Sequence, residues 1–181
     1  MDTQTFYQKA IVFAASKHQE SNQMITDTKL PYVVHLSNVA MEIFVASKYT
    51  DNFDTSFAIQ LSLLHDTLED TQTSYEELET VFGAKIAEGV SALTKNKLLP
   101  KEERMIDSLR RIESLQTEVW AVKLADRITN LQKPPEHWNL FKKTAYKKEA
   151  ALIMERLKGG NSYLENRLQK KITEYETYLY T

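Results

Sequence analysis

The segment "LLHDTLEDT", residues 63–71, concentrates side chains that can bind a metal ion or transfer a proton. It contains His65, Asp66, Glu69 and Asp70 in an otherwise apolar stretch. On an ideal helix these groups share one sector, on the side away from the leucines. Three carboxylates on one face repel each other, and no lysine or arginine within four residues offsets them. A bound cation would relieve this repulsion, whereas the simpler interpretation is a solvated acidic face with one histidine.

Two further stretches place a polar group where an apolar residue is expected. In "LPYVVHLSNVAMEI", His35 lies among aliphatic side chains, and in "WAVKLADRITNL", Asp126 interrupts an apolar helix. A lone histidine of this kind is more often a satisfied core residue than a ligand. A lone buried carboxylate is costly unless it binds a metal or pairs with a cation, here Lys123 or Arg127.

Taken together, these residues form a set of mixed nitrogen and oxygen ligands on three helices. The set has two histidines and two aspartates: His35, His65, Asp66 and Asp126. Imidazole combined with carboxylate suits Mn²⁺, Fe²⁺ or Zn²⁺. With four protein ligands, an octahedral ion keeps two positions for water and substrate.

Helices are expected throughout, because the chain has only four Gly and four Pro and its apolar residues recur at helical spacing. Ser74 with Glu77, and Ser162 with Glu165, have the spacing of capping boxes, which mark helix starts. The sequence therefore predicts an all-α bundle of about eight to ten helices. The expected segments are residues 3–20, 31–47, 55–70, 75–83, 84–94, 101–115 and 117–131, a long helix ending near 158, and a last helix after "GGNS".

Length and composition exclude several classes of protein. With 181 residues, a single domain over 1–181 is expected. The net charge of −2 gives no bulk attraction to nucleic acid or to an anionic membrane, and the absence of Cys rules out disulfides and thiolate ligands. No apolar run approaches the ~18 residues of a membrane span, and the N-terminus does not resemble a secretory signal, so a cytoplasmic protein is expected.

The order of the ligand set, H…HD…D, resembles that of the HD-domain phosphohydrolases. More narrowly, "PYVVH", "LLHDTLEDT" and "VKLADRITNL" resemble the hydrolase domain of the RelA/SpoT alarmone enzymes. The similarity extends from about residue 15 to about residue 165, and is greatest to the stand-alone small alarmone hydrolases, a group that includes the animal Mesh1 proteins. This resemblance implies an HD-domain fold and removal of the 3′-pyrophosphate of (p)ppGpp, which yields GDP or GTP and pyrophosphate.

The resemblance also implies roles for individual residues. The four residues of the ligand set would bind one Mn²⁺, with Fe²⁺ or Zn²⁺ as other options. Glu69 and Asp70 match the catalytic pair that positions the attacking water and moves its proton. Their alternative role is to support His65 or Asp66. The residues that match substrate contacts of the family are Asn130, Lys97, Lys142 and Tyr146. For these four, the alternative is an ordinary surface residue.

One loop departs from the family pattern. After "KHQ" the family usually has a basic pair, whereas this chain has Gln23 and Met24 in "ESNQMI". The substrate therefore stays open between ppGpp, pppGpp and another phosphorylated nucleotide, such as NADPH or a nucleoside phosphate. A catalytically inactive alarmone-binding protein is a further alternative, against which the intact catalytic pair argues. The sequence does not predict the oligomeric state.

Overall fold

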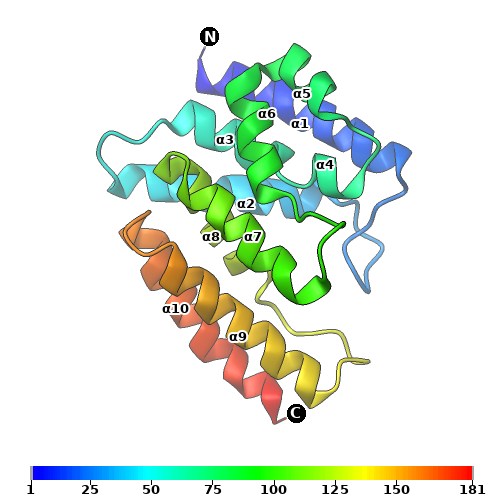
Figure 1. Ribbon diagram of the computed structural model, residues 1–181, viewed down its shortest axis with the longest axis vertical. Helices are drawn as coiled ribbons and strands as arrows, with labels where there is room; N and C mark the ends of the chain where they lie inside the picture. Colours follow the sequence, from blue (N-terminus) through cyan, green and yellow to red (C-terminus); the bar gives the residue numbers. More distant parts are fainter. Residues whose placement is uncertain (1, 181) are drawn as a thin grey trace.

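Every regular element of residues 2–180, the part of the chain described by the computed structural model, is helical (Figure 1). The all-α prediction is therefore confirmed, with ten α-helices and two short 3₁₀ segments among these residues. None of these helices combines the length and the apolar character that crossing a membrane requires. The elements are α1 (Thr3–Glu20), α2 (Val33–Ala46), η1 (Ser47–Tyr49), α3 (Thr55–Leu64), α4 (Thr67–Asp70), α5 (Tyr75–Phe82), α6 (Ala84–Leu93), α7 (Lys101–Glu113), α8 (Thr117–Asn130), α9 (Leu140–Arg156), α10 (Ser162–Tyr175) and η2 (Glu176–Leu179).

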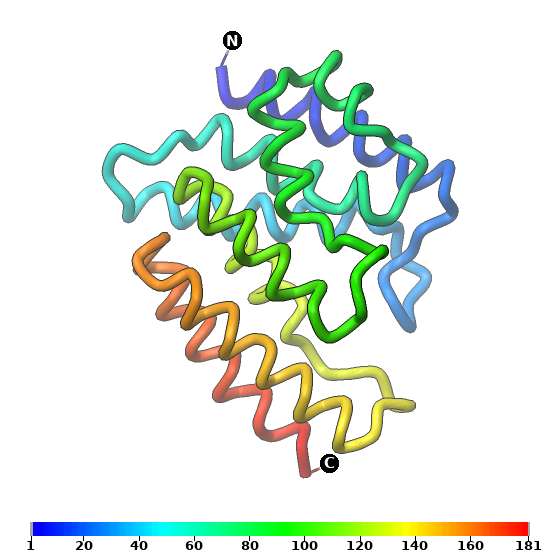
Figure 2. Tube along the Cα trace, in the orientation of Figure 1, coloured from blue at the N-terminus to red at the C-terminus, as the bar shows by residue number. Residues whose placement is uncertain are grey.

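The middle of the molecule is formed by α2, α3 and α8. Helices α1 and α5 lie at the end near the N-terminus, and α9 and α10 run side by side near the C-terminus (Figure 1). Between these ends α2 packs on α3, the next α-helix, and on α8, which lies much later along the trace in Figure 2. From Val119 to Ile128, every residue of α8 except Trp120 is fully buried. A polar side chain on this helix must therefore find an internal partner.

The prediction of one continuous helix over residues 55–70 is wrong, because His65 and Asp66 form a turn between α3 and α4. Side chains at this turn bond to backbone carbonyls that a continuous helix would use. His65 Nδ1 lies 2.8 Å from the carbonyl oxygen three residues earlier. The Thr67 hydroxyl donates to the Leu64 carbonyl at 2.7 Å. The turn places the His-Asp pair at a helix end instead of along a helix face.

The structure contains the predicted capping residue at the start of α5, whereas the cap of α10 lies one residue before the predicted one. The Ser74 hydroxyl accepts from the Glu77 N–H at 3.1 Å and begins α5, as predicted. For α10 the prediction of Ser162 as the cap is wrong. The Asn161 side chain accepts from the Leu164 N–H at 3.0 Å, and Ser162 is the first helical residue. Asn161 takes this position because its buried amide has both an acceptor and a donor to satisfy.

Replacing Asn161 with alanine is expected to lower the free energy of unfolding by about 1–2 kcal/mol. The Asn161 amide caps α10 and also donates to the Thr50 hydroxyl at 2.8 Å, so alanine removes both bonds. Thermal and denaturant unfolding measure the loss. Ser162→Ala, at the exposed neighbouring position, is the matched control and is expected to cost less than about 0.5 kcal/mol. Equal losses in both variants would contradict the assignment of the cap.

Candidate metal centre

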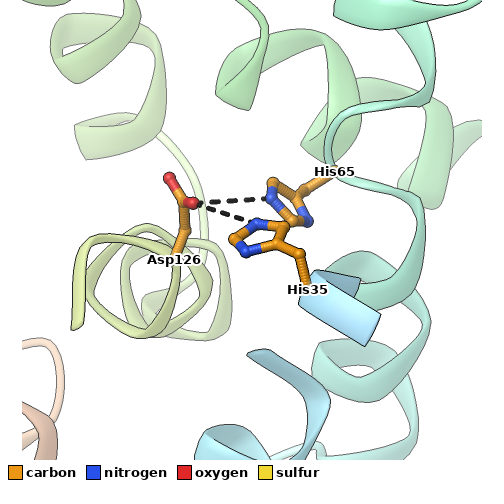
Figure 3. A group of neighbouring side chains, drawn as sticks. All are labelled: His35, His65 and Asp126. Carbon is orange, nitrogen blue, oxygen red and sulfur yellow. Dashed lines mark ion pairs between the residues drawn. The ribbon is translucent and has the colours of Figure 1, made fainter. Parts of the chain in front are cut away.

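Ligand atoms from three segments of the chain converge between α2, α3 and α8. His35 lies on α2, His65 follows the last residue of α3, and Asp126 lies on α8. Their side chains point toward each other (Figure 3), and one ligand atom of each lies within 4.8 Å of the others. Asp126 Oδ1 is 3.5 Å from His35 Nε2 and 3.6 Å from His65 Nε2. The three residues are 5%, 3% and 7% exposed, so the site is screened from solvent.

The Nε2 atoms of both histidines face carboxylate oxygens, which only accept, so an unprotonated nitrogen there has no hydrogen bond among the described residues. For His65 the tautomer of the neutral ring follows from the other nitrogen. Nδ1 lies 2.8 Å from the Ser62 carbonyl oxygen, which only accepts, so Nδ1 carries the hydrogen. The Nε2 lone pair then faces the carboxylates and is free to coordinate a cation. The residues present therefore fit a divalent metal ion.

Asp66 joins the other predicted ligands from the turn after α3. Its Oδ2 atom lies 2.9 Å from His65 Nε2 and 3.7 Å from His35 Nε2. The Tyr32 hydroxyl donates to the same oxygen at 2.5 Å. The structure thus brings all four predicted ligands together, with a tyrosine that sequence reasoning missed. Its spacing could have indicated it, because Tyr32 stands one helical turn before His35.

Removing the Tyr32 hydroxyl is expected to weaken metal binding by about 10-fold or more, because this bond orients the Asp66 carboxylate. Tyr32→Phe keeps the ring, which stacks on His18 with centroids 4.7 Å apart, and loses only the bond. Calorimetric titration with Mn²⁺ measures the affinity. Tyr49→Phe, at an exposed tyrosine of η1, is the control. An affinity of Tyr32→Phe equal to that of the control would show that the hydroxyl does not orient the ligand.

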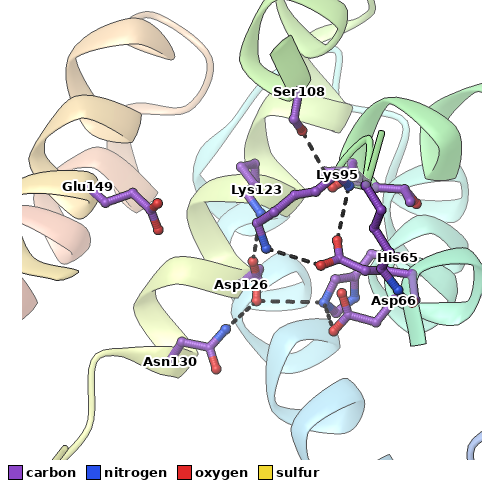
Figure 4. A network of polar contacts seen from close by, with 12 residues as sticks. His65, Asp66, Lys95, Ser108, Lys123, Asp126, Asn130 and Glu149 are labelled. Carbon is purple, nitrogen blue, oxygen red and sulfur yellow. Dashed lines mark hydrogen bonds and ion pairs between the residues drawn. The ribbon is translucent and has the colours of Figure 1, made fainter. Parts of the chain in front are cut away.

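Two polar neighbours hold the Asp126 carboxylate in place (Figure 4). Lys123 Nζ, from a residue that is 5% exposed, lies 3.1 Å from Oδ2, and Asn130 Nδ2 donates to Oδ1 at 2.5 Å. The sequence left the partner open between Lys123 and Arg127. Arg127 pairs instead with Glu149 of α9. Lys123 therefore compensates a carboxylate whose burial would otherwise be costly.

Burial and nearby charges shift the ionisation of these groups. Burial alone would lower the pKa of His65, but the charge of Asp66 and the contacts with both carboxylates outweigh it and raise the pKa to about 10. Burial would raise the pKa of Asp126, yet Lys123 and the histidines hold it well below its usual value. The pKa of Asp66 is lowered as well, against its burial, by the charge of His65. Both carboxylates are thus ionised at neutral pH, and a metal must displace the proton of His65, so its apparent affinity increases with pH.

Glu69, one of the predicted catalytic residues, contacts the loop between α6 and α7. The Lys95 N–H donates to Oε2 at 3.0 Å, and Lys95 Nζ donates to Oε1 at 3.2 Å. Lys97 Nζ donates to the backbone carbonyl of Glu69 at 2.5 Å. Lys95 thus supplies the positive charge that no residue close in sequence provides. No local signal indicates this role, because Lys95 is 26 residues away from Glu69.

Asp70, the other predicted catalytic residue, is the last residue of α4. Burial raises its pKa, the charges of Asp66 and Glu69 raise it further, and a hydrogen bond with Gln23 acts in the opposite direction. A raised pKa makes this carboxylate a better proton acceptor than an ordinary surface aspartate. Glu69 and Asp70 lie on α4, which the turn at His65 and Asp66 separates from α3. They therefore do not continue one helical face with His65, although the sequence predicted that they would.

A cavity of about 890 Å³ opens beside His35. Two of the predicted substrate contacts line it, Asn130 and Tyr146, and two do not, Lys97 and Lys142. Lys142 Nζ lies 4.2 Å from the ring centroid of Trp138, which is part of the lining. Lys97 Nζ instead donates to the backbone carbonyl of Glu69. The roles of both lysines in binding substrate stay predictions.

Known proteins are similar to this chain over most of its length. The HD domain family matches residues 10–159. The guanosine-3′,5′-bis(diphosphate) 3′-pyrophosphohydrolase MESH1 of Danio rerio is 36% identical over 171 residues, which cover 92% of this chain and 92% of that protein. The Homo sapiens protein of the same name is 33% identical over 165 residues, covering 89% of each.

A solved structure is also similar to this chain over most of its length. It is described as "A metazoan ortholog of SpoT hydrolyzes ppGpp and plays a role in starvation responses", and it superposes with a TM-score of 0.80 at 28% identity. The superposition covers 93% of this chain and 94% of that one. The family match spans all four residues of the ligand set and both residues of the predicted catalytic pair. The chain therefore belongs to the HD domain family and, within it, to the group of the MESH1 proteins.

Proposed function

We propose that the protein is a metal-dependent phosphohydrolase that removes the 3′-pyrophosphate of (p)ppGpp, yielding GDP or GTP and pyrophosphate. One observation carries this proposal: His35, His65, Asp66 and Asp126 converge in a buried site, in a chain whose relatives are named for this reaction. The partner is thus a small guanosine polyphosphate.

The ligand set would hold one divalent ion, and Mn²⁺ suits its two imidazoles and two carboxylates, as do Fe²⁺ and Zn²⁺. When bound, such an ion lowers the pKa of a water and polarises a phosphoryl oxygen. The protein contributes the orientation of the ligands. Tyr32 fixes Asp66, while Lys123 and Asn130 fix the two oxygens of Asp126.

Glu69 and Asp70 would position the attacking water and accept its proton. Lys95 holds both oxygens of the Glu69 carboxylate, which supports an orienting role. The raised pKa of Asp70 supports a role as proton acceptor. Water attacks the phosphorus bonded to the 3′ oxygen, that bond breaks, and the 3′ oxygen takes up a proton as pyrophosphate leaves.

The substrate would occupy the cavity beside His35. Asn130 and Tyr146 line it and would contact the nucleotide. Lys142 stacks on a lining residue, Trp138, so a change of its side-chain rotamer would bring the ammonium group to a phosphate. Lys97 is proposed as a phosphate contact because its ammonium group donates to the backbone carbonyl of Glu69, one residue of the proposed catalytic pair.

In this proposal the whole chain, residues 1–181, acts as one HD phosphohydrolase domain in the cytoplasm. The packing of the last helix supports a single unit, because α10 lies wholly beyond residue 159 and still packs on α8, α9 and α2.

A second candidate, hydrolysis of a less highly charged phosphorylated nucleotide, is favoured by the lining of the cavity. Its acidic and basic side chains are Asp27, Lys133 and Glu136, together with His35 and His137. Lys133 Nζ already lies 3.9 Å from Glu136 Oε1, and His137 Nδ1 lies 3.8 Å from Asp27 Oδ2. A doubly pyrophosphorylated nucleotide would find few free cations there.

A substrate panel distinguishes the two candidates. With Mn²⁺ present, the protein is expected to convert ppGpp to GDP and pyrophosphate in equal amounts, and to lose this activity with chelator. Ion-exchange chromatography of the products measures both, and NADPH and nucleoside phosphates serve as comparison substrates. Pyrophosphate release from ppGpp no faster than phosphate release from those nucleotides would reject the first candidate in favour of the second.

A further inference from the structure

Backbone hydrogen bonds hold the loop after α1 at Gln23, one of the two residues that stand where the family usually has a basic pair. The Gln23 N–H donates to the His18 carbonyl at 2.9 Å, and the Gln23 carbonyl accepts from the Tyr32 N–H at 3.3 Å. The side chain is half-buried. Its position is therefore set by the backbone before its amide makes any contact.

The two ends of the Gln23 amide meet partners of different kinds. One end is the NH₂ group, which donates hydrogen bonds, and Gln23 acts on the pKa of Asp70 as such a donor, lowering it against the effect of burial. The Oε1 atom then faces His18, whose Nδ1 lies 2.7 Å away. Because an amide oxygen only accepts, Nδ1 of His18 must carry the hydrogen.

This choice of tautomer has a consequence for the other ring nitrogen of His18. In the neutral ring Nε2 is a bare lone pair, buried and without a hydrogen-bond partner among the described residues. The ring stacks on Tyr32, with centroids 4.7 Å apart and planes at 28°. The Tyr32 hydroxyl in turn donates to Asp66 Oδ2. A series of contacts thus joins Gln23 to Asp66 through His18 and Tyr32.

We propose that Gln23 is a positioning residue, which orients the Asp70 carboxylate with its NH₂ group and holds His18 as the Nδ1-protonated tautomer with its oxygen. The catalytic consequence rests on the proposed function, in which Asp70 handles the attacking water. Only a side chain with a donor at one end and an acceptor at the other can serve both partners. Arginine has donors alone, glutamate has acceptors alone, and methionine has neither.

The first test reads the tautomer directly and requires no turnover. Protein with ¹⁵N-labelled histidine, loaded with diamagnetic Zn²⁺, gives imidazole spectra for four histidines, and a His18→Gln variant assigns the signal. His18 is expected as the neutral Nδ1–H form in the wild type, and as a mixture of tautomers in Gln23→Met. An Nε2–H form in the wild type, or an unchanged spectrum in Gln23→Met, would overturn the proposal.

The second test separates positioning from binding. Gln23→Met and Gln23→Glu are expected to lower kcat for ppGpp about 10-fold or more, with KM and Mn²⁺ affinity changed less than about 2-fold. Gln23→Glu keeps the acceptor for His18 but repels Asp70, so it should lose the most. Gln19→Met, at an exposed residue of α1, is the matched control. A kcat at the level of the control in both variants would overturn the role of Gln23. A wild-type protein inactive on ppGpp would reject the proposed function, while the tautomer test would still decide the network.

Discussion

Asp126→Asn is expected to weaken metal binding by at least about 100-fold and to remove phosphohydrolase activity with it. Loss of a residue that only orients a ligand typically lowers metal affinity about 10- to 100-fold, so loss of a ligand itself should lower it at least as much. Asp126 Oδ1 lies opposite the unpartnered Nε2 atoms of His35 and His65. Asparagine preserves the shape of the side chain but removes the negative charge that a divalent cation requires. Titration with Mn²⁺ and assay of pyrophosphate release measure the two losses.

The same substitution is also expected to destabilise the protein by about 3 kcal/mol, because it leaves the buried Lys123 ammonium without its partner. A second substitution separates the two effects. The double variant Asp126→Asn/Lys123→Met should recover most of the lost stability, since no unpaired charge remains, but should stay inactive. Chemical denaturation without metal measures the recovery.

Glu149→Gln is the matched control for this pair. It removes the carboxylate that pairs with Arg127, on the adjacent position of α8, and should leave metal affinity near the wild-type value. If Asp126→Asn bound Mn²⁺ as tightly as this control does, Asp126 would not be a ligand. In that case its only role would be the ion pair with Lys123.

Glu69→Gln is expected to lower kcat by about 100- to 10,000-fold, the range typical for loss of a general acid or base. Metal affinity should stay nearly unchanged. The Glu69 carboxylate accepts from both the backbone and the ammonium group of Lys95. Glutamine keeps the size of the side chain, but it cannot take a proton and offers only one acceptor oxygen. Steady-state kinetics on ppGpp and calorimetric titration of Mn²⁺ measure the two quantities.

Lys95→Met serves as the companion variant, because it removes the charge that faces Glu69 and leaves the carboxylate in place. Its kcat should fall less than that of Glu69→Gln. Turnover by Glu69→Gln at the wild-type rate, together with weaker metal binding, would assign Glu69 a supporting role for His65 or Asp66. Wild-type protein that binds ppGpp without hydrolysing it would instead favour the inactive alarmone-binding alternative.

The sequence by itself determined the elements and the identity of the metal-binding candidates. Helix spacing and capping residues such as Ser74 act locally, within one or two turns, so a single sequence carries enough information to place them. His35 and Asp126 could be singled out for a related reason. Each interrupts an apolar helix, and a polar group in such a place requires a partner.

Only the tertiary structure decided which groups meet. Lys95, not Lys97, contacts the Glu69 carboxylate, and Lys123, not Arg127, contacts Asp126. The first choice depends on how α4 faces the loop after α6, a contact between residues 26 positions apart that spacing cannot indicate. The second agrees with helical spacing, because Lys123 lies one turn before Asp126 on the same face, whereas Arg127 is adjacent to Asp126 and points in another direction.

The turn at His65 and Asp66 was decided in the same way. Local spacing favours one continuous helix there, but side-chain bonds to backbone carbonyls interrupt it. The resulting turn directs Asp66 to the Tyr32 hydroxyl. Contacts of this kind join residues tens of positions apart and exist only once the helices have packed, which is why local pattern indicated the candidate ligands and packing alone brought them together.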